Sequence, residues 1–257
     1  MSEASDGHIF KAYDGALSEL RLRAHAMGVL VADQVETAVR ALLESDRKAA
    51  ELVLFREEQI NAYQTDIEAE SFRLLAQRAP VASDLRMVLA ISRAVTDLER
   101  AGDEAKKIAR FALASASAGR SAGGPSRVMH RPLRHMAELA SEAMRVAVDA
   151  LDRGDAGVAH DVARLDRELD QEFEAALRQL MTVAMERTRL LRPIFDTVFA
   201  LKGLERIGDH AKNVAEHVVF LVSGADVRHA TAPERGMPAK ESQHRYDGLM
   251  PARPARG

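Results

Sequence analysis

Two short acidic motifs carry the residues of this sequence whose types and spacing suit metal binding. The first is LERAGDEAKKIA at residues 98–109, and the second is LERIGDHAKNVA at residues 204–215. Each motif places an Asp four residues after a Glu, and on an α-helix such side chains are neighbours. Paired carboxylate oxygens are ligands for hard or borderline cations such as Mg, Mn or Fe. The candidate metal ligands are therefore Glu99, Asp103, Glu205 and Asp209.

A second interpretation assigns the same carboxylates to surface salt bridges. Asp103 is spaced to pair with Lys107 at i+4, and Asp209 with Lys212 at i+3. Exposed pairs of this kind contribute only about 0.2–1 kcal/mol. Two adjacent carboxylates repel each other, and a multivalent cation relieves that repulsion. The repetition of the pair favours the metal site, and the salt-bridge interpretation stays open beside it.

Each motif also contains a glycine within its helical pattern. Gly102 and Gly208 fall inside the apolar face, where glycine costs about 1 kcal/mol relative to alanine. We therefore expect a neighbouring helix, or the coordination shell of an ion, to come close to the backbone there. Arg100 and Arg206 point away from the carboxylates on the same helical wheel.

Composition and periodicity indicate that helices must position these motifs. The chain has 257 residues, of which 47% are hydrophobic and only 4% aromatic, with no Trp. Apolar residues recur at helical spacing in both halves of the chain. In the first half the stripes are Leu20, Met27, Val31, Val35, Ala38 and Leu42, then Leu52, Ile60, Tyr63, Ile67 and Leu74, then Ile91, Val95, Leu98, Ala105 and Ile108. Helix-stop signals at Ser45-Asp46, Pro80 and Ser83-Asp84 separate these three stripes.

The second half repeats the same three-helix unit. The two motifs agree at eight of their twelve positions, and ALLESD at 41–46 matches ALDRGD at 150–155. A Gly/Ser/Pro-rich stretch at 115–126, before the second unit, is typical of a linker. We therefore predict an all-α fold of two tandem, pseudo-symmetric three-helix bundles. Their bounds are residues 8–119 and 127–224, followed by a flexible tail at 225–257.

Charge and missing motifs exclude several functions. A net charge of −3 offers no general basic field for nucleic acid, and the absence of Cys fits a reducing compartment. The polar N-terminus and the lack of a long apolar run predict a cytoplasmic protein with no membrane insertion. The chain has no nucleotide-binding or hydrolase motif. Carboxylate-bridged di-iron enzymes place Glu-x-x-His motifs on facing helices of a bundle, and the only such spacing here, Glu241 to His244, lies in the tail. We therefore expect no enzyme activity.

A few other polar residues have both a structural and a functional interpretation. Asp33 and Glu142 occupy matching positions in the two units, where they either complete metal shells or lie on solvated faces. His210 follows Asp209 directly and so points away from it, which predicts surface exposure. Asp84 stands at the start of a helix, where a capping role is expected.

Longer stretches around the motifs resemble one known family. They are LERAGD and LERIGD themselves, the segment APVASDLRMVLAISRAVTDLERAGD at 79–103, and QLMTVAMERTR at 179–189. Through these segments the sequence resembles the PhoU family of bacterial phosphate-transport accessory proteins, from about His8 to His229.

The resemblance implies a rod-like pair of three-helix bundles, a homodimer, and metal clusters on the E-x-x-x-D helices. It also implies a negative regulator in phosphate signal transduction that links the phosphate ABC transporter ATPase to a membrane sensor histidine kinase. The ligands carried over are those of the two motifs, with Fe, Mn, Mg or Zn as the candidate ions and no organic cofactor. The alternative is a metal-independent, co-chaperone-like helical scaffold, which does not require paired carboxylates.

Overall fold

The protein is built from six long helices in a computed structural model that describes residues 3–78, 82–117, 127–187 and 191–224. Its elements are α1 (Glu3–Glu44), α2 (Arg47–Arg78), α3 (Ala82–Ser117), α4 (Arg127–Arg153), a 3-10 turn η1 (Ala156–Val158), α5 (Ala159–Glu186) and α6 (Leu191–Ser223). The described ranges contain no β-strand. The all-α prediction is confirmed, and so is the order of three helices per unit.

The first turn of each unit repeats in atomic detail. The N–H of Asp46 donates to the carbonyl five residues earlier at 3.0 Å, and Asp155 makes the same bond at 3.1 Å. The residue before each aspartate is left-handed, with φ of +55° at Ser45 and +64° at Gly154. This is the geometry of a Schellman helix end. Each aspartate then accepts backbone N–H bonds from the start of the next segment, so ALLESD and ALDRGD encode one turn.

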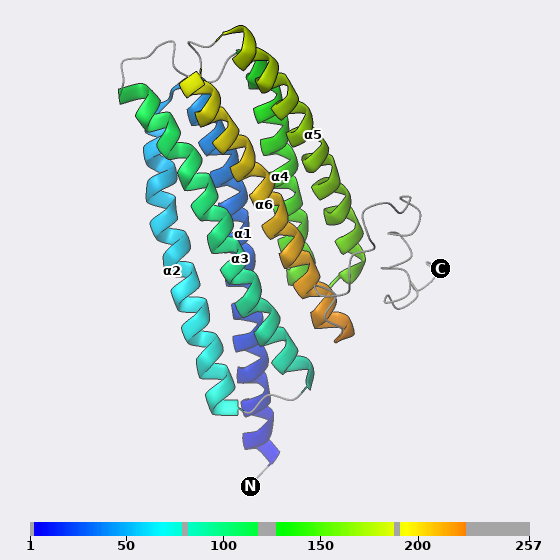
Figure 1. The fold of residues 1–257 in the computed structure, drawn as a ribbon. Coiled ribbons are helices and arrows are strands. Elements are labelled where there is room, and N and C mark those ends of the chain that lie inside the picture. Colours follow the sequence, from blue (N-terminus) through cyan, green and yellow to red (C-terminus); the bar gives the residue numbers. More distant parts are fainter. Residues whose placement is uncertain (1–2, 79–81, 118–126, 188–190, 225–257) are drawn as a thin grey trace.

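Four helices form the centre of the molecule. Helix α3 packs against α6 and α1 packs against α4, while α2 and α5 lie on the outside of the first and second unit respectively (Figure 1). The buried apolar side chains make one cluster that runs through both units. The two units therefore share a core across α1–α4 and α3–α6. Independent folding of residues 8–119 and 127–224 stays a prediction.

Most of the predicted apolar stripes face this core. The largest fully buried side chains include Leu20, Met27, Ile60, Ile91 and Leu98. The predicted place of Leu52 in the second stripe is wrong. The Leu52 side chain is 40% exposed, because the adjacent Val53, fully buried, takes the inward position on α2.

The helix bounds differ from the predicted helix breaks at one place. Helix α3 continues to Ser117, so the first residues of the predicted linker, Ser115–Ser117, are helical. Helix α2 ends at Arg78 and α3 begins at Ala82, in agreement with the predicted break, although Pro80 itself lies outside the described residues. The rest of the linker and the predicted tail at 225–257 also lie outside them. Over the described ranges, no helix is long and apolar enough to span a bilayer.

Close helix contacts explain the glycines of the two motifs. A Cβ added to Gly102 would lie 3.2 Å from both Ile60 Cδ1 and Glu57 Oε2 on α2. A Cβ on Gly208 would collide with Leu169 Cδ2 on α5. The prediction that something comes close at both positions is confirmed, and in each unit it is the middle helix.

Candidate metal centre

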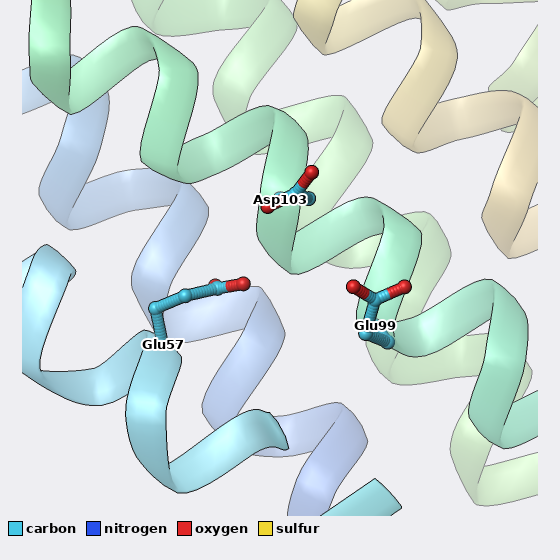
Figure 2. A group of neighbouring side chains, drawn as sticks. All are labelled: Glu57, Glu99 and Asp103. Carbon is cyan, nitrogen blue, oxygen red and sulfur yellow. The ribbon is translucent and has the colours of Figure 1, made fainter.

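Three carboxylates from two helices meet at the first motif. Glu99 and Asp103 lie one turn apart on α3, and Glu57 extends towards them from α2 (Figure 2). One oxygen from each of the three carboxylates lies within 4.8 Å of the other two. This spacing matches a set of oxygen ligands around one cation, and carboxylates on facing helices form such sites in helical bundles.

Glu57 is the most unusual member of this group because only 2% of it is exposed. The amide of Gln34, on α1, donates from Nε2 to Glu57 Oε2 at 3.0 Å and to the carbonyl of Gly102 at 3.1 Å. The other oxygen, Glu57 Oε1, is buried and has no hydrogen-bond partner. Buried acceptors without partners are costly, so this oxygen is a ready ligand for a cation.

Burial and neighbouring charges also change the pKa of Glu57 in the first site. Desolvation raises the pKa of Glu57, against the effects of the Gln34 hydrogen bond and of Lys106. The neighbouring charges of Asp103 and Glu99 raise that pKa further. A divalent cation among these three carboxylates would oppose both the desolvation and the repulsion. The residues present therefore fit a metal ion.

Two lysines approach the first site from its own helix. Lys106 Nζ lies 3.3 Å from Asp103 Oδ1 and 3.6 Å from Glu57 Oε1. Lys107 Nζ lies 3.8 Å from Asp103 Oδ2 and donates to Glu104 at 3.0 Å. The predicted ion pair of Asp103 with Lys107 is thus present as a long contact. The three carboxylates still lie within 4.8 Å of one another beside these lysines.

The second motif faces two acidic residues on α5. Burial, followed by the charges of Glu205 and Asp166, raises the pKa of Asp209. Burial, followed by the charges of Asp166, Glu205 and Asp209, raises the pKa of Asp170 in the same way. Four carboxylates therefore repel one another between α5 and α6.

Lysines lie directly against the second group. Lys212 Nζ lies 2.8 Å from Asp166 Oδ2, and Lys202 Nζ lies 2.5 Å from Glu205 Oε2. Glu205 Oε2 has no partner that meets hydrogen-bond geometry, so the contact with Lys202 is an ion pair and not an aligned hydrogen bond. Lys212 thus pairs across to α5, whereas the salt-bridge interpretation of the sequence assumes a pair along α6.

Sequence reasoning missed the candidate ligands from the middle helices, Glu57, Asp166 and Asp170. A signal for two of them was present. The offset between Glu57 and Asp166 in the sequence is the same as the offset that relates ALLESD to ALDRGD. Extending the repeat alignment into the second helix would have paired these two carboxylates.

The remaining candidate residues lie elsewhere in the fold. Asp33 Oδ1 accepts from Arg145 at 2.8 Å between α1 and α4, which favours the structural interpretation of Asp33 over a metal shell. Its counterpart Glu142 is exposed and lines a separate surface pocket of α4 and α5. Asp84 lies in the first turn of α3, as expected. Arg206 points away from the carboxylates, as predicted, and its Nη1 reaches Glu104 Oε1 on α3 at 2.8 Å.

The prediction of an exposed His210 is wrong. Its side chain is 12% exposed, and its Nδ1 lies 3.0 Å from Asp97 Oδ1 across the α3–α6 contact. His217 Nε2 lies 3.0 Å from the other oxygen of Asp97, and Asn213 donates to Oδ1 at 3.0 Å. Although burial opposes it, these hydrogen bonds hold the pKa of Asp97 well below its usual range. Asp97 thus ties the two units together.

The fold and the site define a class of helical proteins made of two repeated three-helix units, each with acidic side chains between its second and third helices. The model of the PhoU domain matches this chain twice, at residues 24–112 and 133–218. The chain belongs to the PhoU family, which confirms the resemblance seen in the sequence.

Several relatives cover most of the chain. The Pseudomonas putida "Phosphate-specific transport system accessory protein PhoU homolog" is 44% identical over 227 residues, which are 88% of this chain and 87% of that protein. The Escherichia coli (strain K12) accessory protein PhoU is 33% identical over 235 residues, covering 88% and 92% of the two chains.

Solved structures share the fold. The crystal structure of PhoU from Pseudomonas aeruginosa aligns with a TM-score of 0.77 at 41% identity, over 83% of this chain and all of that one. The phosphate transport system regulatory protein PhoU from Streptococcus pneumoniae aligns with a TM-score of 0.74 at 28% identity, over 84% and 99% of the two chains. Homologues of this chain are thus accessory proteins of phosphate transport.

Proposed function

We propose that this protein is a cytoplasmic negative regulator of phosphate uptake and of the phosphate-starvation response. In this role it links the ATPase of the phosphate ABC transporter to a membrane sensor histidine kinase, as a homodimer and without catalysis of its own. The observation that carries the proposal is similarity over 88% of the chain to proteins named as accessory to the phosphate-specific transport system.

The metal sites are the chemical part of the proposal. Glu57, Glu99 and Asp103 would hold an ion between α2 and α3. The second site would draw on Glu205 and Asp209 from α6 and on Asp166 and Asp170 from α5. A multivalent cation such as Fe, Mn, Mg or Zn supplies positive charge at the point where carboxylates from two helices repel one another. The buried, unbonded Oε1 of Glu57 supports this assignment.

Gene deletion tests the regulatory role. In cells grown with abundant phosphate, loss of the gene is expected to switch on phosphate-starvation promoters, and a copy of the wild-type gene is expected to restore repression. Repression that persists in the deletion strain would refute the proposal. Expression of a distant, unrelated promoter serves as the control.

The metal-independent scaffold is the competing function. It predicts no bound metal after purification without chelator, and full activity when the acidic motifs lose their charge. The regulator proposed here predicts bound metal in the wild-type protein. Elemental analysis of the purified chain, combined with promoter repression by the charge-free variant, separates the two.

A further inference from the structure

The buried carboxylate has a different kind of partner in each of the two acidic sites. In the first site the partner of Glu57 is the neutral amide of Gln34, at 3.0 Å. The position that corresponds to Gln34 in the second unit, at the offset that relates Glu57 to Asp166, is the buried Ala143. There the partner of the buried Asp166 is the ammonium group of Lys212, at 2.8 Å. A neutral donor leaves the carboxylate charge available to a cation, whereas an ammonium group compensates it.

Each site has two lysines beside it, and the sites differ in how close these lysines lie to the carboxylates. Lys106 corresponds to Lys212, yet its Nζ lies 3.6 Å from the buried Glu57 Oε1, beyond hydrogen-bond distance, and donates instead to Asp103 at 3.3 Å. Lys202, which pairs with Glu205, corresponds to Thr96 in the first unit. The ammonium groups of the second site therefore lie 2.5 and 2.8 Å from its carboxylates, whereas those of the first site lie 3.3 Å or more from theirs.

We propose that Lys202 and Lys212 are built-in counter-cations that a divalent ion must displace before it binds the second site. The inference rests on the proposed metal-binding function and adds that the two sites fill in order, the first before the second. Displacement is physically open to both lysines, because their side chains are 49% and 39% exposed and their charged ends can move into solvent.

Stepwise filling gives each unit a separate response to metal concentration. The first site has a preformed group of three oxygens within 4.8 Å of one another, and the ion displaces only the longer contacts of Lys106, at 3.3 and 3.6 Å, so less rearrangement accompanies binding there. The second site must first exchange its ammonium groups for the ion. The lysines also protect the second site when metal is scarce, since they limit the repulsion among its carboxylates.

The test measures Mn²⁺ binding to the full chain by isothermal titration and by the electron paramagnetic resonance signal of free Mn²⁺. The wild-type protein is expected to show two classes of sites. A background variant with Glu57→Gln, Glu99→Gln and Asp103→Asn is expected to retain only the weaker class. In that background, Lys212→Gln should strengthen binding on the order of tenfold or more, because it removes a positive charge next to the ion.

The matched control is Lys48→Gln in the same background. It removes the same charge at an exposed position at the start of α2, away from the second site, and should leave the affinity unchanged. If circular dichroism shows that Lys212→Gln disturbs folding, Lys202→Gln provides a second test variant, because about half of the Lys202 side chain is exposed to solvent. It too should strengthen binding.

A second readout does not depend on affinity. In excess chelator, Lys212→Gln should lower the midpoint of thermal unfolding relative to Lys48→Gln, and Mn²⁺ should restore it. Equal affinity of the two sites in the wild type, or no gain of affinity from either lysine variant, would overturn the inference. Failure of the wild-type protein to bind Mn²⁺ at all would instead overturn the proposed metal function on which the inference rests.

Discussion

Replacement of Glu57 by glutamine separates two effects of the first site: the loss of stability that its buried carboxylate causes in the metal-free protein, and the stability that bound metal adds. The change keeps the shape of the side chain and the hydrogen bond accepted from Gln34, but it removes the charge. In the metal-free protein, Glu57 Oε1 is buried with no hydrogen-bond partner and only a 3.6 Å contact to Lys106 Nζ, and buried acceptors without a hydrogen bond cost about 1–3 kcal/mol. The neutral amide also removes the repulsion with the carboxylates of Glu99 and Asp103, which lie within 4.8 Å. We therefore expect Glu57→Gln to stabilise the metal-free protein by about 1 kcal/mol.

The direction of this effect follows from the pKa of Glu57. Because burial raises that pKa, the folded protein binds the proton more tightly than the unfolded chain does. The ionised carboxylate therefore lowers stability, and this penalty grows as the pH rises from the ordinary pKa of 4.5 through the raised pKa of the folded state. Removing the charge removes the penalty. Lowering the pH through the same window should stabilise the metal-free wild type more than the variant.

Bound metal should reverse which of the two proteins, the wild type or Glu57→Gln, is the more stable. At a free Mn²⁺ concentration about 100 times the dissociation constant, one site stabilises the folded state by about 2.7 kcal/mol. The wild type should gain this stabilisation, and Glu57→Gln should lose most of it. In chelator the variant should melt about 2–4 °C above the wild type, and in saturating Mn²⁺ it should melt below it.

Differential scanning calorimetry in chelator and in Mn²⁺ provides the measurement. Glu58→Gln is the matched control, because the neighbouring Glu58 is exposed on the same helix and should respond to neither condition. A variant that melts below the wild type in chelator, or that gains as much from Mn²⁺, would refute the reasoning about the first site.

Other consequences can be tested in parallel. Changing all four carboxylates of the two acidic motifs to their amides should preserve the circular dichroism of the helices while bound metal falls in elemental analysis; equal metal in both proteins would contradict the site. Asp97→Ala should cost about 2–4 kcal/mol in urea unfolding, because it leaves the donors of His210, His217 and Asn213 unpaired; a loss below about 0.5 kcal/mol would show that the contact is dispensable. The lowered pKa of Asp97 means that its stabilisation is present above its ordinary pKa of 3.8 and is lost as the pH falls below it, so the wild type should lose more stability in acid than Asp97→Asn does. Residues 8–119 and 127–224 expressed separately should keep helical circular dichroism but melt less cooperatively than the whole chain, since each half exposes its share of the α1–α4 and α3–α6 contacts; no helical signal in either would assign the helices to one interleaved core. Co-purification with the transporter ATPase should weaken as salt rises if the interface is charged, and association insensitive to salt would indicate an apolar one.

Local patterns in the sequence determined the helices, their order and the duplication. An apolar residue every three or four positions, and an aspartate placed after a left-handed turn, act within a few residues of themselves. The equivalence of Ser45-Asp46 with Gly154-Asp155 could therefore be recognised without any structure. The neighbouring placement of Glu99 and Asp103 was equally available, because the i, i+4 relation is a property of any α-helix.

Only the tertiary structure decided which residues complete the sites and the contact between the units. Glu57 and Glu99 belong to different helices, and the distance between their carboxylates depends on how α2 packs against α3. Periodicity could not tell whether His210 meets water or another helix, since a wheel gives the direction of a side chain and not what lies there. The packing of α6 on α3 supplied Asp97 at that place, and with it one of the polar contacts that join the two repeats.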